Sequence, residues 1–177
     1  MKLLLHACCG PCLLVPYDVF SREHEVEVVF FNPNIYPAEE YYRRRDTLLD
    51  YANARDITVH EEAYNPRLWL SFAGAAVRDR EARCGDCYQL RMMATAKFAR
   101  ARGFDAIAST LTVSPYQRQE MIRKAGRMAA DEAGVIYLDM DFRQSFSGAV
   151  SKSRELGMYR QSYCGCEISA DSRRQKK

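Results

Sequence analysis

The fold is decided by the run Lys2-Leu-Leu-Leu-His-Ala-Cys8 and by Cys9-Gly-Pro-Cys12, which follows it at once. The first run is short and almost wholly apolar, as expected of a strand buried on both faces of a parallel sheet. Gly10 and Pro11 suit a sharp turn into a helix. The apolar face of that helix would be supplied by Leu13, Leu14, Tyr17 and Phe20. The stretch therefore predicts a strand, loop and helix unit.

The same alternation continues along the chain. We predict strands at 25–31, 57–60, 106–109 and 135–138, and helices at 38–55, around Trp69 and Phe72, and at 84–102. A last helix is predicted to open at Ser114-Pro-Tyr-Gln117, which reads as a capping box, and to end at Gly134. Alternating strands and helices predict an α/β fold with a parallel sheet. Sites in such sheets lie at the carboxyl ends of strands, where the first cysteines follow.

Length and composition bound the remaining possibilities. A chain of 177 residues with 47% hydrophobic content fits one domain, predicted at 1–171, with a basic disordered tail at 172–177. The net charge of +3 is too small by itself to indicate a nucleic-acid partner. The longest charge-free stretch, 3–17, is short of the roughly 20 residues that span a membrane. No export signal is recognised, so we expect a cytoplasmic protein without membrane association.

Seven cysteines form three tight groups. The odd number and close spacing favour a metal over a disulfide framework. Thiolates are soft ligands that suit iron–sulfur clusters and zinc. Buried, non-ligating cysteines would explain one pair but not three groups, each beside a glycine. The candidate metal ligands are Cys8, Cys9, Cys12, Cys84, Cys87, Cys164 and Cys166.

The spacing does not choose the metal by itself. Two Cys-x2-Cys units could supply a tetrahedral structural zinc. A domain of this size with a full apolar pattern does not need zinc in order to fold, and seven cysteines exceed one zinc site. The residues favour an iron–sulfur cluster and leave zinc open.

Five motifs in order identify a family resemblance. They are Leu4 to Cys12, Asn32-Pro-Asn-Ile35, Arg83-Cys-Gly-Asp-Cys-Tyr88, Ser109 to Tyr116, and Tyr159 to Cys166. Together they resemble the QueH family of epoxyqueuosine reductases, over about 2–169. The resemblance implies a fold of the adenine-nucleotide alpha-hydrolase (HUP-like) type and a cobalamin-independent reduction of epoxyqueuosine to queuosine at the wobble position of tRNA.

The resemblance also implies a [4Fe-4S] cluster beside a second iron or other metal. Carried over by motif, Cys8, Cys9, Cys84 and Cys87 are the cluster ligands. Some family members carry Asp where Cys12 stands, so Cys12 is expected to ligate a metal without being an indispensable ligand of the cluster. Removing an epoxide oxygen takes two electrons and protons, and no G-x-G-x-x-G nucleotide fingerprint occurs. An external one-electron donor is therefore expected besides the tRNA substrate.

Two rival functions compete with this one. ATP-using tRNA thiolases of the same general fold need a Ser-Gly-Gly-x-Asp-Ser phosphate loop after the first strand, where this chain has Cys8 to Cys12. That position disfavours ATP chemistry. A non-catalytic, zinc-bound RNA-binding module remains open, and metal content would distinguish it.

Further site residues are predicted outside the cysteines. Arg43, Arg44 and Arg45 follow two tyrosines on a helix and are candidates for RNA phosphate binding, with a solvated helix face as the alternative. The other candidates for substrate contact or proton transfer, besides Cys12, are Thr112, Tyr116, Arg160 and Tyr163. The segment before Cys164 is expected to fold back over the cluster. His6 is predicted to be a hydrogen-bonded core residue.

Overall fold

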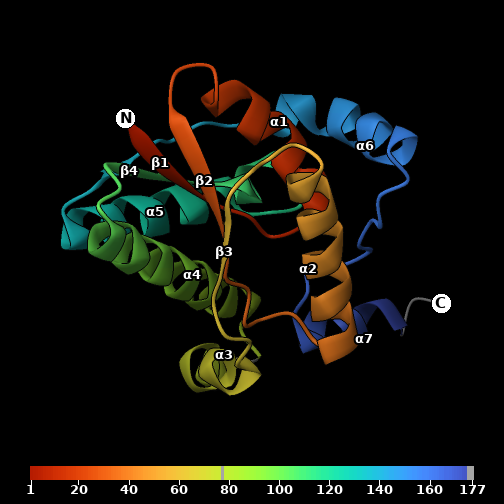
Figure 1. The fold of residues 1–177 in the computed structure, drawn as a ribbon. Coiled ribbons are helices and arrows are strands. Elements are labelled where there is room, and N and C mark those ends of the chain that lie inside the picture. Colours follow the sequence, from red (N-terminus) through yellow and green to blue (C-terminus); the bar gives the residue numbers. More distant parts are fainter. Residues whose placement is uncertain (77, 175–177) are drawn as a thin grey trace.

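A five-stranded parallel sheet organises the protein (Figure 1). The computed structural model describes residues 1–76 and 78–174. The strand order is β3-β2-β1-β4-β5, and every pairing is parallel, as predicted. The strands are β1 (Lys2–His6), β2 (Glu25–Phe30), β3 (Val59–Glu61), β4 (Ala106–Ser109) and β5 (Ile136–Tyr137).

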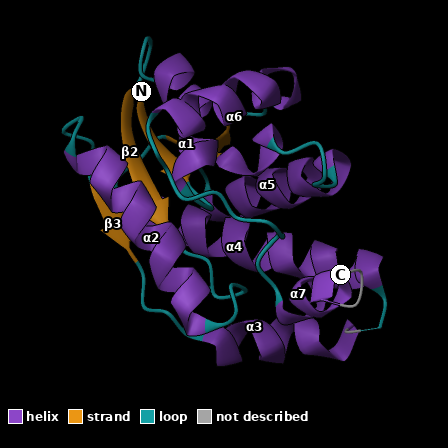
Figure 2. Cartoon of the chain, turned by 90° about the vertical axis from the view of Figure 1, so that its right-hand side faces the viewer, coloured by secondary structure: helices purple, strands orange, loops and turns teal. Residues whose placement is uncertain are grey.

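Helices cover both faces of the sheet (Figures 1 and 2). The α-helices are α1 (Gly10–Phe20), α2 (Ala38–Asn53), α3 (Pro66–Ala73), α4 (Arg80–Arg102), α5 (Gln119–Ala133), α6 (Phe146–Glu155) and α7 (Glu167–Arg174). Short 3-10 turns are η1 (Gly74–Ala76), η2 (Thr110–Val113) and η3 (Arg143–Ser145). The core on one face includes side chains of α1, α2 and α6, and the core on the other includes those of α4 and α5. No helix in the described ranges is long and apolar enough to cross a bilayer.

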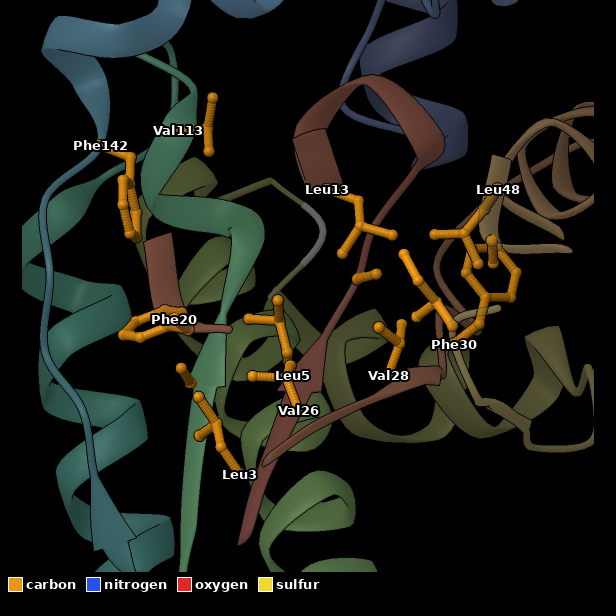
Figure 3. Close-up of a cluster of buried hydrophobic side chains, with 14 of the residues drawn as sticks. Leu3, Leu5, Leu13, Phe20, Val26, Val28, Phe30, Leu48, Val113 and Phe142 are labelled. Carbon is orange, nitrogen blue, oxygen red and sulfur yellow. The ribbon is translucent and has the colours of Figure 1, made fainter. Parts of the chain in front are cut away.

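The apolar first strand supplies both cores because successive side chains of a strand point to opposite faces. Leu3 and Leu5 belong to the first core, drawn in Figure 3, and Leu4 to the second. Parallel register places Leu3 beside Val26 and Leu5 beside Val28. The central strand is thus buried on both faces, as its composition predicts.

Two predicted helix starts are wrong, for local reasons. Helix α4 begins at Arg80 rather than at Cys84, because Asp79 Oδ1 accepts hydrogen bonds from the backbone N–H groups of Glu81 and Ala82. This earlier start places Cys84 and Cys87 in the first turns of a capped helix. Helix α5 begins at Gln119, because Ser114 Oγ accepts from the N–H of Tyr116 and closes a turn there.

Other boundaries also differ from the prediction. The third strand lies at Val59–Glu61, and α6 was not predicted. The buried positions of α6 are Ala149 and Ser153, which are small residues that give little apolar periodicity. Residues 172–174 of the expected tail are helical, because α7 continues to Arg174. Residues 175–177 of that expected tail lie outside the described residues.

Candidate metal centre

Buried polar side chains hold the carboxyl edge of β1 in place. His6 is fully buried, with Nδ1 3.1 Å from Ser109 Oγ and Nε2 3.1 Å from the carbonyl oxygen of Phe31. Burial, and then the positive charge of Arg91, lower the pKa of His6 to about 4. The ring is therefore neutral at pH 7, with Nε2–H donating to Phe31 and Nδ1 accepting from Ser109. The prediction of a hydrogen-bonded core histidine is confirmed.

The loop after β1 is tied to the ends of its neighbouring strands. Asn32 Nδ2 donates to the carbonyl oxygen of Ala7 at 2.9 Å. Thr110, which begins η2, accepts from the N–H of Cys8 at 3.1 Å, and its Oγ1 also lies 3.5 Å from Cys8 Sγ, to which it donates. These bonds fix the backbone of Cys8 and supply one hydrogen bond to its sulfur.

The first cysteine group consists of Cys8, Cys9 and Cys12. Their sulfur atoms all lie within 4.8 Å of one another. Cys9 and Cys12 are buried at the N-terminal end of α1, where Pro11 occupies the first turn, as predicted. Gln161 reaches this group from the C-terminal segment and donates through Nε2 to Cys9 Sγ at 2.9 Å. This group of thiols can hold a metal ion or part of a cluster.

Electrostatics differ among these three thiols. Hydrogen bonds from Cys12 and Cys9 hold the pKa of Cys8 well below its usual value, although burial opposes them. Burial raises the pKa of Cys9, and hydrogen bonding to Cys8 raises that of Cys12. The thiolate is the form in which cysteine binds a metal, and these hydrogen bonds favour it at Cys8.

The second cysteine group lines a pocket between α4 and the C-terminal segment. Its members are Cys84, Cys87, Cys164 and Cys166. The sulfurs of Cys164 and Cys166 lie 3.7 Å apart, and the hydrogen bond from Cys166 lowers the pKa of Cys164 to about 5. Burial raises the pKa of Cys84 and of Cys87. Distant parts of the sequence thus bring four thiols to one pocket.

Arg44 anchors the segment that carries Cys164. Its side chain is only 2% exposed, pairs with Glu40 at 2.7 Å, and donates to the carbonyl oxygens of Cys164 at 3.2 Å and Tyr163 at 3.1 Å. Tyr159 donates to the same Glu40 carboxylate at 2.6 Å. Arg44 is a predicted candidate for RNA phosphate binding or for a solvated helix face, and both need an exposed side chain. The burial of Arg44 against Glu40 and the C-terminal segment is contrary to both.

Gly165 allows the segment to approach closely. Its φ is +124°, and a Cβ there would lie 3.0 Å from Asn34 Nδ2 and from Ile35 Cγ1. Its carbonyl oxygen accepts from the N–H of Tyr36 at 2.8 Å. A side chain at this position would strain the backbone and separate the segment from the loop after β2.

The remaining predicted residues have different environments. Arg43 is exposed, and Arg45 pairs with Asp46 at 2.7 Å and Glu61 at 3.7 Å. Thr112 is buried, and its Oγ1 donates to the carbonyl oxygen of Ser109 at 3.1 Å. Tyr116 is 79% exposed.

The C-terminal candidates also differ from one another. Arg160 is exposed, whereas Tyr163 is half-buried and donates to the carbonyl oxygen of Tyr36. Sequence reasoning missed Gln161, which lies between two predicted residues and carries no recognisable signal. It also missed Arg91, which looks like an ordinary charge within a long helix.

The donor set fits a soft metal or a cluster. Seven free thiols are gathered in two neighbouring groups. Beside them, Asn34 Oδ1 and Gln161 Oε1 are buried without a hydrogen-bond partner in the part of the chain that the structure describes. Buried polar atoms are normally paired, so such atoms beside a thiol site are consistent with a bound group that completes it.

The fold and the site together define a class of protein. The sheet order is that of an α/β protein of the adenine-nucleotide alpha-hydrolase type. The thiols at the carboxyl edge of the sheet form a cysteine site suited to a metal. A crystal structure described as a predicted subunit of tRNA methyltransferase from Methanocaldococcus jannaschii matches with a TM-score of 0.57. That match covers 88% of this chain and 75% of the other, at 8% identity, and supports the fold alone.

The particular family follows from the sequence comparisons. The family model described as Epoxyqueuosine reductase QueH matches residues 3–172, and the chain belongs to this family. Proteins named Epoxyqueuosine reductase QueH include one from Thermotoga maritima, 34% identical over 98% of this chain and 93% of that protein. Others are from Dehalococcoides mccartyi, 29% identical over 95% and 92%, and Staphylococcus epidermidis, 28% identical over 96% and 76%.

Proposed function

We propose that this protein is an oxidoreductase that reduces epoxyqueuosine in tRNA to queuosine. Two electrons and two protons convert the epoxide to an alkene, and the oxygen leaves as water. The single observation that carries this proposal is the family match over residues 3–172 to proteins named for that reaction. The two groups of thiols at the carboxyl edge of the sheet support it, because thiolates can hold a redox-active metal centre.

We infer that the site holds a [4Fe-4S] cluster with Cys8, Cys9, Cys84 and Cys87 as its ligands. When bound, such a cluster supplies electrons one at a time. Cys12, which lies in the first group, is proposed to hold a second iron or another metal. Cys164 and Cys166 close the second group from the C-terminal side and are further candidate ligands.

Protein side chains around the cysteines would orient and protonate the substrate. Tyr163 is the candidate to donate a proton or to stack on a base; burial raises its pKa to about 12, so its hydroxyl is a weaker acid than that of a free tyrosine. Arg160 is exposed on the same segment and could hold a phosphate or a developing oxyanion. The exposed ring of Tyr116 is proposed to stack on a base, and Thr112 would act by supporting η2 rather than by direct contact.

Two partners follow from the reaction. The tRNA would be bound through exposed cations, of which Arg43 is the better candidate on α2 because Arg45 already pairs with carboxylates. An external one-electron donor would deliver the electrons. We place the reaction in the cytoplasm, where free thiols persist.

The test is anaerobic conversion of tRNA that carries epoxyqueuosine. Reconstituted protein with dithionite should yield a nucleoside one oxygen atom lighter, measured by mass spectrometry after digestion. Omitting dithionite should abolish conversion, and so should Cys84→Ser. The exposed substitution Arg100→Met should leave conversion intact. Conversion without any reductant would refute the one-electron donor, and a colourless, zinc-replete protein that binds tRNA without converting it would refute the enzyme.

A further inference from the structure

Arg91 is a buried cation with no carboxylate partner among the described side chains. Its side chain on α4 is 4% exposed, and Nε donates to the carbonyl oxygen of Cys87 at 3.2 Å. Among the side chains that the structure describes, which exclude those of 77 and 171–177, no carboxylate lies within ion-pair distance of its guanidinium. The described lining of the pocket beside it holds four thiols and no carboxylate. Thiols are thus the groups available there to carry negative charge.

Arg44 shows how the same protein treats another buried arginine. That guanidinium lies 2.7 Å from the carboxylate of Glu40 and donates to two carbonyl oxygens. A buried charge is costly unless it is paired, and Arg44 meets this requirement with a carboxylate. For Arg91 the described groups that can balance its charge are the thiols of the cysteine site.

Arg91 lies against the second cysteine group. It lines the same pocket as Cys84, Cys87, Cys164 and Cys166, and its Nε donates a hydrogen bond to the backbone of Cys87. A fixed positive charge beside buried thiols favours their thiolate forms.

We propose that Arg91 is a positioning residue that balances the negative charge of the thiolate-bound cluster and raises its reduction potential. The proposal rests on the proposed function only in requiring a redox-active cluster. One-electron reduction adds a negative charge to the site. A fixed cation in a low-dielectric interior stabilises that reduced form more than the oxidised form. Arg91 thus makes the centre easier to reduce by an external donor.

The experiment measures the midpoint potential of the reconstituted protein by spectroelectrochemistry. Arg91→Met should make reduction at least tenfold less favourable, which is a shift of about 59 mV to more negative potential for one electron. Arg91→Lys, which keeps the charge, should restore a potential near that of the unchanged protein. The control is Arg100→Met, because Arg100 is an exposed arginine on the same helix. This variant should leave the midpoint potential unchanged.

Each outcome decides the proposal. A full cluster with an unchanged potential in Arg91→Met would overturn it and leave the proposed function standing. If Arg91→Met binds no cluster, a cluster retained in Arg91→Lys would support the need for a positive charge at this position. Loss of the cluster in both variants would overturn the proposal. An unchanged protein that binds no iron–sulfur cluster would overturn the proposed function as well, which separates the two failures.

Discussion

Arg44 Nη1 donates a hydrogen bond of 3.2 Å to the carbonyl oxygen of Cys164, which lies 120 residues further along the chain. The same guanidinium donates to Tyr163 and pairs with Glu40. In Figure 1 the blue segment that joins α6 to α7 passes along α2. One buried arginine thus connects the second helix to the last two cysteines of the site.

Replacing Arg44 by Met should destabilise the protein by about 3–5 kcal/mol, because the Glu40 carboxylate would remain buried without its cation. Urea denaturation of the metal-free protein would measure the free energy of unfolding. Arg45→Met should cost less than about 1 kcal/mol, since the Arg45 pairs are partly exposed. A destabilisation at Arg44 no larger than that at Arg45 would contradict the anchoring role.

Anaerobic reconstitution should give about four irons per chain, or somewhat more if a second metal binds. Cys84→Ser and Cys87→Ser should abolish the cluster absorbance, whereas Cys12→Ser should retain most of it. Iron analysis and visible spectra measure these effects, with circular dichroism to confirm folding. If all seven single Cys→Ser variants kept equal iron and absorbance, the ligand assignment would be wrong.

Binding of tRNA should weaken steeply as salt rises, because phosphate binding releases counterions. Arg43→Ala should flatten the slope of log affinity against log salt by roughly one unit for each phosphate that the variant no longer binds. Arg45→Ala should have a smaller effect, because Asp46 and Glu61 already neutralise that side chain. Fluorescence anisotropy at several salt concentrations measures both slopes. A slope unchanged by Arg43→Ala would place the RNA surface elsewhere.

Gly126→Ala should destabilise the protein by about 1–3 kcal/mol, because a Cβ on this residue of α5 would overlap the ring of Tyr137 on β5. Gly148→Ala is the matched control, since no atom lies within 4 Å of the added Cβ in α6. That control should stabilise the protein by about 0.5–1 kcal/mol. Thermal or urea denaturation measures both, and equal effects would contradict the close packing of α5 on β5.

The type and order of the main elements could be predicted from the chain because their signals are local. A run such as Leu3 to Leu5 can be buried on both faces only in the middle of a sheet, and Gly103 and Gly134 end their helices in the left-handed conformation. The motif order also placed the chain in its family. Helix α6 was not predicted because its buried side chains are small. Helix α4 begins before the predicted residue because its N-cap, Asp79, lies outside the apolar pattern.

The grouping of the cysteines could not be obtained in this way. Spacing in the chain separates Cys87 from Cys164, yet both line one pocket, because the return of the C-terminal segment depends on the buried contacts of Arg44 and on the backbone of Gly165. The sequence does not distinguish Arg43, Arg44 and Arg45 from one another. Only packing in the folded protein buries Arg44 and leaves the other two facing outward. The Glu40–Arg44 ion pair is local in the chain, but Arg44 also bonds Tyr163 and Cys164, and Arg91 lines a pocket with Cys164 and Cys166, so no local pattern encodes their surroundings.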